Sequence, residues 1–267
     1  MQTDYCKTRY PILLLHGAHA RDEGHYRFWG RIPDLLRQNG AQVFTGGQDA
    51  WGSIEGNAQV IDQRLMKVLA QTGSPKVNII AHSKGGLEAR YLISVMGRYP
   101  HVASLSTVST PHHGCRIVDF FEKWPDWFYR GVSACQDFYW KKHGDAAPDF
   151  YTASRELSTH ACREFAKAAP DMPGVFYQSW ACAMSNPFGD PWYMGSYLLE
   201  YLLAGENDGL VSVKSAKWGE FRGVLRTKGI AGISHNDAGD VRERDFKGMD
   251  IPWVYIKMAH ELKEKGF

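Results

Sequence analysis

Ser83 lies in a sequence context that could make its hydroxyl a nucleophile. The apolar run Val77–Ala81 predicts a buried strand, and the amphipathic run Leu87–Met96 predicts a helix shortly afterwards. At such a strand-to-helix turn, small residues such as Ala81 and Gly85 let the two elements approach and lift the serine out of the backbone. The pentapeptide alone would also suit any glycine-rich turn, so the prediction of a nucleophile depends on this placement.

Attack by a serine on a carbonyl produces an oxyanion, which needs two backbone N–H donors. One donor is the residue after the nucleophile, here Lys84. The second comes from the loop after an earlier strand. The run Ile12–His16, followed by Gly17 and Ala18, predicts such a loop with Ala18 as the donor. We expect His16 to support this loop rather than to transfer protons.

Strands and helices alternate along the chain in the way that builds a parallel sheet. Apolar runs bounded by Gly, Pro or polar residues predict strands over Ile12–His16, Gln42–Phe44, Val77–Ala81, Leu105–Ser109 and Val175–Trp180. Amphipathic patterns predict helices over Phe28–Asn39, Ala58–Gln71 and Ile251–Lys265. Ligands of such sheets bind at the carboxyl ends of the strands. The 267 residues suit a single α/β domain over 1–267.

The stretch 117–171 interrupts this alternation. It has no convincing strand and predicts a helical insertion. Its aromatic residues include Trp124, Trp127, Phe128, Phe138, Tyr139 and Trp140. Such a segment is either a lid over the active site or a set of extra helices that pack on the fold.

Composition narrows the function classes. Hydrophobic residues make up 44% and charged residues 22%, which is typical of globular proteins. The net charge of +2, without a dense basic run, gives no support to nucleic acid binding. No apolar run approaches the roughly 18 residues that span a bilayer, so no transmembrane segment is expected. No leader is recognisable, which leaves the cytoplasm and secretion with a removed leader both open.

Five cysteines are spaced without any CxxC pair, and they predict free, buried thiols. They are Cys6, Cys115, Cys135, Cys162 and Cys182.

Further motifs occur along the chain in one order. They are Tyr10-Pro11-Ile12 with His16-Gly17, Phe28-Trp29-Gly30-Arg31-Ile32-Pro33, Gly40-Ala41-Gln42-Val43, Pro75-Lys76-Val77-Asn78, Ala81–Gly86, Ser109-Thr110-Pro111-His112-His113-Gly114, Tyr177-Gln178-Ser179-Trp180 and Asn207-Asp208-Gly209-Leu210-Val211. Together they resemble the bacterial true lipases of Pseudomonas and Burkholderia type. In the insertion and the tail, lipases and esterases of anaerobic Firmicutes look closer. The resemblance implies the α/β-hydrolase fold, with helices on both faces of a mostly parallel sheet and a helical lid at 117–171.

The resemblance also implies the partners of Ser83. In this fold the acid and then the histidine follow the nucleophile along the chain. Asp208 stands where the family carries its acid, and His235, the only histidine between Asp208 and the final helix, matches the base. The alternatives are a turn aspartate before glycine and an ordinary surface histidine. We expect Ser83, Asp208 and His235 to form a catalytic triad.

The lipases that this chain resembles carry a structural calcium ion, which links the loop of the catalytic histidine to an upstream loop through two aspartates. Asp237 matches one ligand, and Asp190 is the best candidate for the other, although its spacing to Asp208 differs from the family's. Two carboxylates with backbone carbonyls would suit Ca²⁺, and two solvated loop aspartates are the alternative. Lys214 stands where relatives often have a disulfide cysteine. No organic cofactor is expected.

These features predict a serine carboxylic-ester hydrolase, a lipase that cleaves acylglycerol esters through an acyl-enzyme on Ser83. The partner would be a lipid or another apolar ester, with transient contact at a lipid–water interface. A short-chain or polyester-degrading carboxylesterase is the alternative within the same chemistry. A non-catalytic binding module is disfavoured, because the triad and both oxyanion positions are present.

Overall fold

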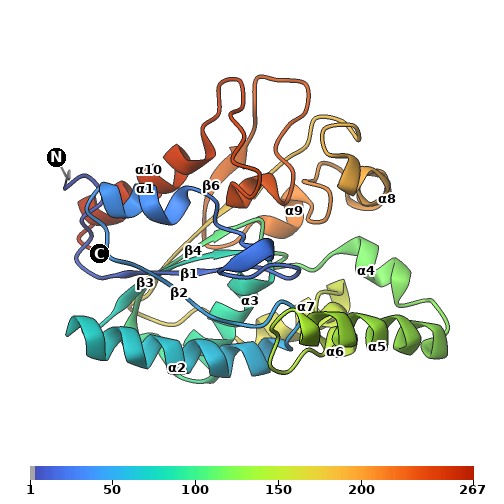
Figure 1. Ribbon diagram of the computed structural model, residues 1–267, viewed down its shortest axis with the longest axis horizontal. Coiled ribbons are helices and arrows are strands. Elements are labelled where there is room, and N and C mark those ends of the chain that lie inside the picture. Colours follow the sequence, from blue (N-terminus) through green and yellow to red (C-terminus); the bar gives the residue numbers. More distant parts are fainter. Residues whose placement is uncertain (1–3) are drawn as a thin grey trace.

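A parallel sheet forms the centre of the molecule (Figure 1). The computed structural model describes residues 4–267, and within them the sheet has six strands in the order β2-β1-β3-β4-β5-β6. The strands are β1 (Ile12–Leu15), β2 (Val43–Thr45), β3 (Val77–His82), β4 (Val102–Val108), β5 (Phe176–Cys182) and β6 (Glu220–Leu225). Every neighbouring pair is parallel, which confirms the predicted α/β architecture.

Helices cover both faces of the sheet because its central strands are apolar on both sides. Leu13 and Leu15 of β1 pack with α2 (Ile54–Thr72) and α3 (Lys84–Arg90), whereas Ile12 and Leu14 pack with α1 (Ile32–Gln38) and α10 (Ile251–Glu264). Successive side chains of a strand point to opposite faces, which explains this division. Figure 1 shows α1 and α10 on one side of the sheet and α2 and α3 on the other.

The segment between β4 and β5 is helical, as predicted for 117–171. It contains α4 (Arg116–Phe121), α5 (Asp126–Lys142), α6 (Phe150–Arg155) and α7 (Thr159–Ala168). The remaining helices are α8 (Met194–Ala204), α9 (Val213–Ala216), a π-helical turn at Tyr91–Val95 that continues α3, and 3-10 turns at Gly24–Tyr26, Tyr99–His101, Pro191–Tyr193 and Asp237–Gly239.

Strand β6, helix α8 and the short helix α9 have no counterpart in the prediction. Strand β6 lies at the edge of the sheet, where Glu220 and Arg222 are exposed and Gly223 follows them, so it has no continuous apolar run. Helix α8 is apolar around most of its circumference, and Leu202 on it is 82% exposed. A pattern without two distinct faces gives no amphipathic signal.

The insertion is tied to the loop after β2 by two buried carboxylates. Asp145 accepts hydrogen bonds from the backbone N–H groups of Ala50 and Trp51, both at 3.0 Å, and it also pairs with Arg21. Asp49 accepts in return from the backbone of the segment 146–147 at 2.7–2.8 Å. These bonds satisfy backbone donors that would otherwise be buried without partners. The segment that follows α5 is therefore fixed to the loop after β2.

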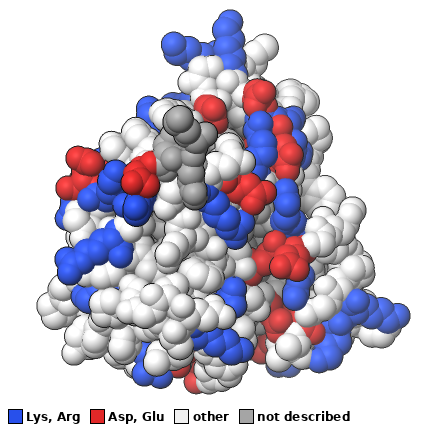
Figure 2. Space-filling view, turned by 60° about the vertical axis from the view of Figure 1, so that its left-hand side comes forward, with Lys and Arg blue, Asp and Glu red and all other residues white. Residues whose placement is uncertain are grey.

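Figure 2 shows positive and negative side chains interspersed on one face of the molecule. In the part of the chain that the structure describes, no helix has both the length and the apolar character to cross a membrane.

All five cysteines are free, and four are buried as predicted, but the prediction is wrong for Cys135, which is exposed on α5. Helix α5 keeps only part of its surface against the fold.

We predict that Asp145→Ala lowers the free energy of unfolding by about 3 kcal/mol, because two buried N–H groups and Arg21 lose their acceptor. Urea unfolding followed by circular dichroism measures this change. The control is Asp126→Ala, which removes an exposed carboxylate of α5 paired with Arg130 and should leave stability nearly unchanged. Equal effects of the two substitutions would show that Asp145 does not anchor the insertion.

Candidate active site

Ser83 occupies a strained turn between β3 and α3. Its φ of 52° and ψ of −130° lie outside the regions that side chains other than glycine normally adopt. This conformation lifts the hydroxyl above the carboxyl ends of the strands, as the sequence context predicts. Ser83 is only 6% exposed, so its surroundings exclude most of the solvent.

Two glycines next to Ser83 permit a close approach of neighbouring backbone. A Cβ atom on Gly17 would lie 2.6 Å from the Ser83 Cβ, and a Cβ atom on Gly85 would lie 2.4 Å from the carbonyl oxygen of His16. A Cβ atom does not approach another non-bonded atom that closely. The loop after β1 therefore packs directly on the turn that carries Ser83, and only glycine fits at either position.

A continuous chain of hydrogen bonds joins Ser83, His235 and Asp208. The His235 Nε2 lies 2.9 Å from the Ser83 Oγ, and the His235 Nδ1 lies 2.8 Å from the Asp208 Oδ2. The second oxygen of Asp208 accepts from the backbone N–H groups of Leu210 at 3.1 Å and Val211 at 2.9 Å. With Asp208 fully buried and held in this way, its carboxylate fixes the orientation of the imidazole. This arrangement can move a proton from Ser83 to His235.

His82, which the sequence analysis assigns no role, supports the ring of His235. Its ring centroid lies 4.4 Å from that of His235 on one side and 4.4 Å from that of Phe28 on the other. Complete burial, with the neighbouring His235 and His16, lowers the pKa of His82 well below the usual histidine value. A neutral ring at this position adds no competing positive charge beside His235. An aromatic residue directly before the nucleophile is the only sequence signal that could have indicated this role.

The predicted oxyanion donors, Ala18 and Lys84, belong to the two segments that Gly17 and Gly85 bring together. Lys84 is the first residue of α3, where backbone N–H groups have no partner within the helix. Ala18 packs against the buried Trp51 and Trp140. The Nδ1 of His16 lies 2.8 Å from the Gly17 carbonyl oxygen, which suits the predicted supporting role of His16.

The side chain of Lys84 points away from the reaction centre into a buried polar network. Its ammonium donates to the carbonyl of Gly52 at 2.5 Å and pairs with Glu88, one turn later on α3. Asn57 of α2 donates to the same Glu88 carboxylate at 2.7 Å. Removing one partner of a buried ion pair is costly, so this network holds the start of α3 firmly against α2. The sequence analysis assigns this role to none of the side chains of Lys84, Glu88 and Asn57.

The structure brings the two predicted calcium ligands together, but with a cation already between them. Asp190 and Asp237 both bond to the guanidinium of Arg242, and both carboxylates lie within hydrogen-bonding distance of the Ser234 hydroxyl. A guanidinium cannot ligate a metal ion, and it neutralises the carboxylates that would. The residues at this position therefore do not fit Ca²⁺.

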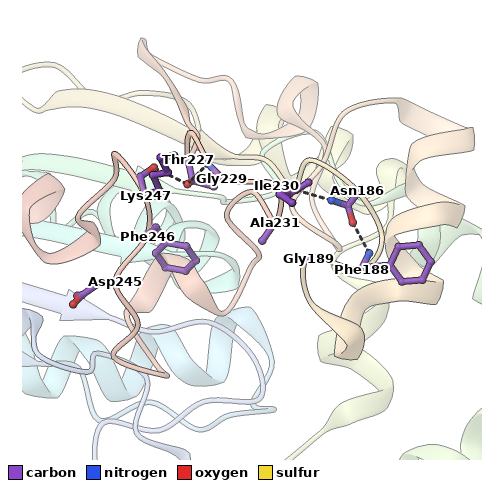
Figure 3. A pocket seen from close by; sticks show the side chains of 10 residues that line it. All are labelled: Asn186, Phe188, Gly189, Thr227, Gly229, Ile230, Ala231, Asp245, Phe246 and Lys247. Atoms are coloured by element: carbon purple, nitrogen blue, oxygen red, sulfur yellow. Dashed lines mark hydrogen bonds between the residues drawn. The ribbon is translucent and has the colours of Figure 1, made fainter.

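A surface groove of about 490 Å³ lies beside these loops and not at Ser83. Figure 3 shows that it runs between the segments 186–189, 227–231 and 245–247. The Asn186 side chain donates to the Ile230 carbonyl at 2.5 Å and so holds two of these segments together. None of the predicted site residues lines the groove.

Comparison with known proteins identifies the family. The chain is 30% identical to triacylglycerol lipase 2 of Saccharomyces cerevisiae, over 90% of this chain and 74% of that protein. It is 31% identical to a triacylglycerol lipase of Vibrio cholerae, over 99% of this chain and 91% of that protein. No family model matches the chain.

Solved structures share the fold. The mature lipase BlEst2 of Bacillus licheniformis has a TM-score of 0.66 at 19% identity, covering 94% of this chain and 91% of its own. The metagenomic carboxyl esterase MGS0156 has a TM-score of 0.75 at 15% identity, covering 96% of this chain and 76% of its own. The chain therefore belongs to the triacylglycerol lipase family and is an ester hydrolase of the α/β-hydrolase fold, which confirms the predicted family and fold class.

Glu200 of α8 gives the site region a pH dependence. Its Oε2 accepts from the backbone N–H of Ile117 at 2.9 Å and so joins α8 to the start of α4. Burial, partly offset by hydrogen bonds from the backbone of Ile117 and Arg116, raises the pKa of Glu200 to about 7. The folded protein consequently favours the protonated, neutral form of this side chain.

We predict that stability contributed by neutral Glu200 is complete below pH 4.5, its ordinary pKa, and is lost as the pH rises towards 7. The total loss from this group is about 3 kcal/mol. The substitution Glu200→Gln removes this part of the change in the free energy of unfolding with pH, because an amide is neutral throughout. The control Glu164→Gln, at an exposed position of α7, retains it. Urea titrations between pH 4.5 and 7.5 measure the effect, and parallel curves for Glu200→Gln and the unmodified protein would contradict it.

Proposed function

We propose that this protein hydrolyses acylglycerol esters with apolar acyl chains, with Ser83 as nucleophile, His235 as general base and Asp208 as the residue that orients it. The observation that carries the proposal is the unbroken hydrogen-bonded chain from the Ser83 hydroxyl through the His235 imidazole to the buried Asp208 carboxylate. Membership of the triacylglycerol lipase family supports the choice of substrate class.

The reaction follows from the geometry. His235 Nε2 takes the proton of Ser83 as Oγ attacks the ester carbonyl, and the oxyanion receives hydrogen bonds from the N–H groups of Ala18 and Lys84. The imidazolium then protonates the leaving alcohol, and the acyl group remains on Ser83. Water, deprotonated by His235, attacks the acyl carbon. The bond from that carbon to the Ser83 Oγ then breaks, His235 returns its proton to the Oγ, and the fatty acid leaves. Asp208 stabilises the imidazolium that forms in both steps.

Exposed apolar side chains near the site support a lipid substrate. Trp127 on α5 is 76% exposed, Trp192 before α8 is 81% exposed and Leu202 on α8 is 82% exposed. Helix α8 contacts α4 through Glu200, and α4 leads along the chain into α5, which carries Trp127; Figure 1 shows α4 between the other two helices. Large exposed apolar groups mark surfaces that meet a partner. We propose that this surface meets the lipid–water interface and that α4 and α5 act as a lid.

Trp140 differs from the exposed aromatic residues of the insertion. It is 1% exposed and packs with Trp51 beside Ala18, so it belongs to the structural core of the site. A test of the lid therefore needs substitutions of exposed side chains, because deletion of the whole segment would also remove Trp140.

We predict that Ser83→Ala lowers ester hydrolysis by on the order of 10³-fold or more and leaves the fold intact. Hydrolysis of p-nitrophenyl butyrate and the melting temperature measure the two effects. The control Ser74→Ala, in the turn before β3, should retain activity. Activity of Ser83→Ala at the level of this control would remove Ser83 as the nucleophile.

For the substrate, we predict higher kcat/KM for medium and long acyl chains than for acetate, and activity that rises once the substrate exceeds its solubility limit. The triple substitution Trp127→Ser, Trp192→Ser and Leu202→Ser should reduce turnover of emulsified triglyceride at least severalfold while leaving soluble butyrate esters little affected. Met66→Ser, an exposed position on α2, is the control. A preference for acetate in the unmodified protein would instead assign a short-chain carboxylesterase.

A further inference from the structure

We propose that the guanidinium of Arg242 takes the structural place of a divalent cation, so that this hydrolase holds the loop of His235 by an internal ion pair and works without calcium. The inference rests on the proposed role of His235 for its effect on activity. Its effect on stability is independent of that role.

Arg242 bridges the two loops that a metal ion would join. Its Nη2 pairs with the Asp190 Oδ2, lies 2.8 Å from the Asp237 Oδ1 and lies 3.2 Å from the Ser234 Oγ. The Ser234 Oγ in turn lies 2.7 Å from the Asp190 Oδ2 and 2.9 Å from the Asp237 Oδ2. A single guanidinium nitrogen thus stands at the centre of three oxygen-bearing side chains, which is the arrangement expected around a small cation.

The charges at this centre are balanced without a metal ion. Asp190 and Asp237 have side chains that are 2% and 3% exposed, and they supply two negative charges. Arg242 and Arg244, whose Nη2 lies 3.2 Å from the Asp237 Oδ1, supply two positive charges. A divalent ion would have to displace Arg242 or leave excess positive charge in a buried position.

The pKa shifts support the same arrangement. Burial alone would raise the pKa of Asp190, but hydrogen bonds from Arg242 and Ser234 outweigh it and leave the pKa below the ordinary aspartate value. Burial likewise opposes the charge on Arg242, and its bonds to Asp190 and Asp237 nevertheless raise its pKa. Both groups are therefore charged across the physiological range.

The ion pair acts on the reaction through the backbone on either side of His235. Ser234 precedes His235 and Asp237 follows it by two residues, so Arg242 holds both flanks of the base. The end of the loop has a second support, because Arg31 bonds to the buried Asp240 through its Nε and its Nη2, both at 2.9 Å. Arg242 is accordingly a positioning residue, which sets the place of the imidazole without contacting substrate.

The first test uses the unmodified protein. Exhaustive EDTA treatment, followed by addition of Ca²⁺, should change neither the melting temperature nor kcat for p-nitrophenyl butyrate. A fall in melting temperature on chelation that Ca²⁺ reverses would overturn the proposal, whatever the role of His235, because binding to the native state raises stability by mass action.

The second test removes the guanidinium. Arg242→Gln should lower the melting temperature by on the order of 10 °C and kcat by about tenfold or more, with KM little changed, since the base is displaced and substrate contacts remain. The matched control is Arg98→Gln. Arg98 has a side chain 37% exposed, against 34% for Arg242, and bonds to Asp62 at 2.6 and 2.8 Å far from the site. Equal behaviour of the two variants would overturn the proposal.

The third test asks whether a metal ion can replace the missing group. In Arg242→Ala the two carboxylates lose their main partner, so millimolar Ca²⁺ should raise the melting temperature of this variant and restore part of kcat, while the unmodified protein does not respond. Arg242→Lys keeps the positive charge but has fewer donors. We expect its melting temperature and kcat to lie between those of the unmodified protein and Arg242→Gln. If the neutral variants do not fold, this variant tests the proposal in their place. Wild-type stability and kcat in Arg242→Lys and Arg242→Ala would contradict the proposal.

Discussion

The backbone conformation of Ser83 determines how the ends of the central strands must be held. A serine at a φ of 52° stores strain on the order of 1–3 kcal/mol, and it persists only where its surroundings leave no alternative. The surroundings are the hydrogen bonds of the sheet, which continue past the strand ends. The N–H of Ser83 donates to Val108 at 3.0 Å, and that of Ser109, itself at a φ of 51°, donates to Trp180 at 2.9 Å. The ends of β3, β4 and β5 are thereby held in register.

The other half of the site is built on loops, and loops need a different kind of support. The segments that carry Asp208 and His235 follow β5 and β6 and lie outside the regular strands. Single backbone bonds tie them to the chain after β5, from Met184 to Asn207 at 2.9 Å and from Ile233 to Ala183 at 2.8 Å. Further polar contacts add to these bonds. The N–H of His235 donates to the carbonyl of Asp208 at 2.8 Å, and Tyr255 of α10 donates to the carbonyl of Ala238 at 2.7 Å. The paired charges of Arg242 and Arg31 complete this support. Because the acceptors Asp237 and Asp240 are buried, breaking one of these bonds leaves an unsatisfied group, and the loop resists displacement.

The parts of the fold that could be predicted from the sequence are those with a local signal. Strands β1, β3 and β4 are buried along their whole length, and each contains apolar residues that face both sides of the sheet. The strand before Ser83 and the glycines after it predict Ser83 as the nucleophile. The order of the acid and the base along the chain then follows from the family resemblance. In each case the information lies within about ten residues or in a motif of fixed order.

The parts that could not be predicted depend on residues far apart in the sequence. Arg242 and Asp190 are 52 positions apart, and nothing near either one indicates that they meet. The calcium expectation did not consider this arginine, since aspartates that bind a metal ion and aspartates that bind a guanidinium look alike in sequence. His82 and the Lys84–Glu88 pair gain their roles from tertiary packing. Edge strand β6 and the apolar helix α8 lack the periodicity on which such predictions rest.

The proposed mechanism requires an acyl group on Ser83 during ester cleavage. Rapid acid quenching of the protein with an activated ester such as p-nitrophenyl butyrate, followed by peptide mass spectrometry, detects this group, because acylation by such an ester is fast. We expect one butyryl group on the peptide that contains Ser83, appearing within the first turnover. A butyryl group on a different residue, or turnover with no adduct on Ser83 at any quench time, would contradict it.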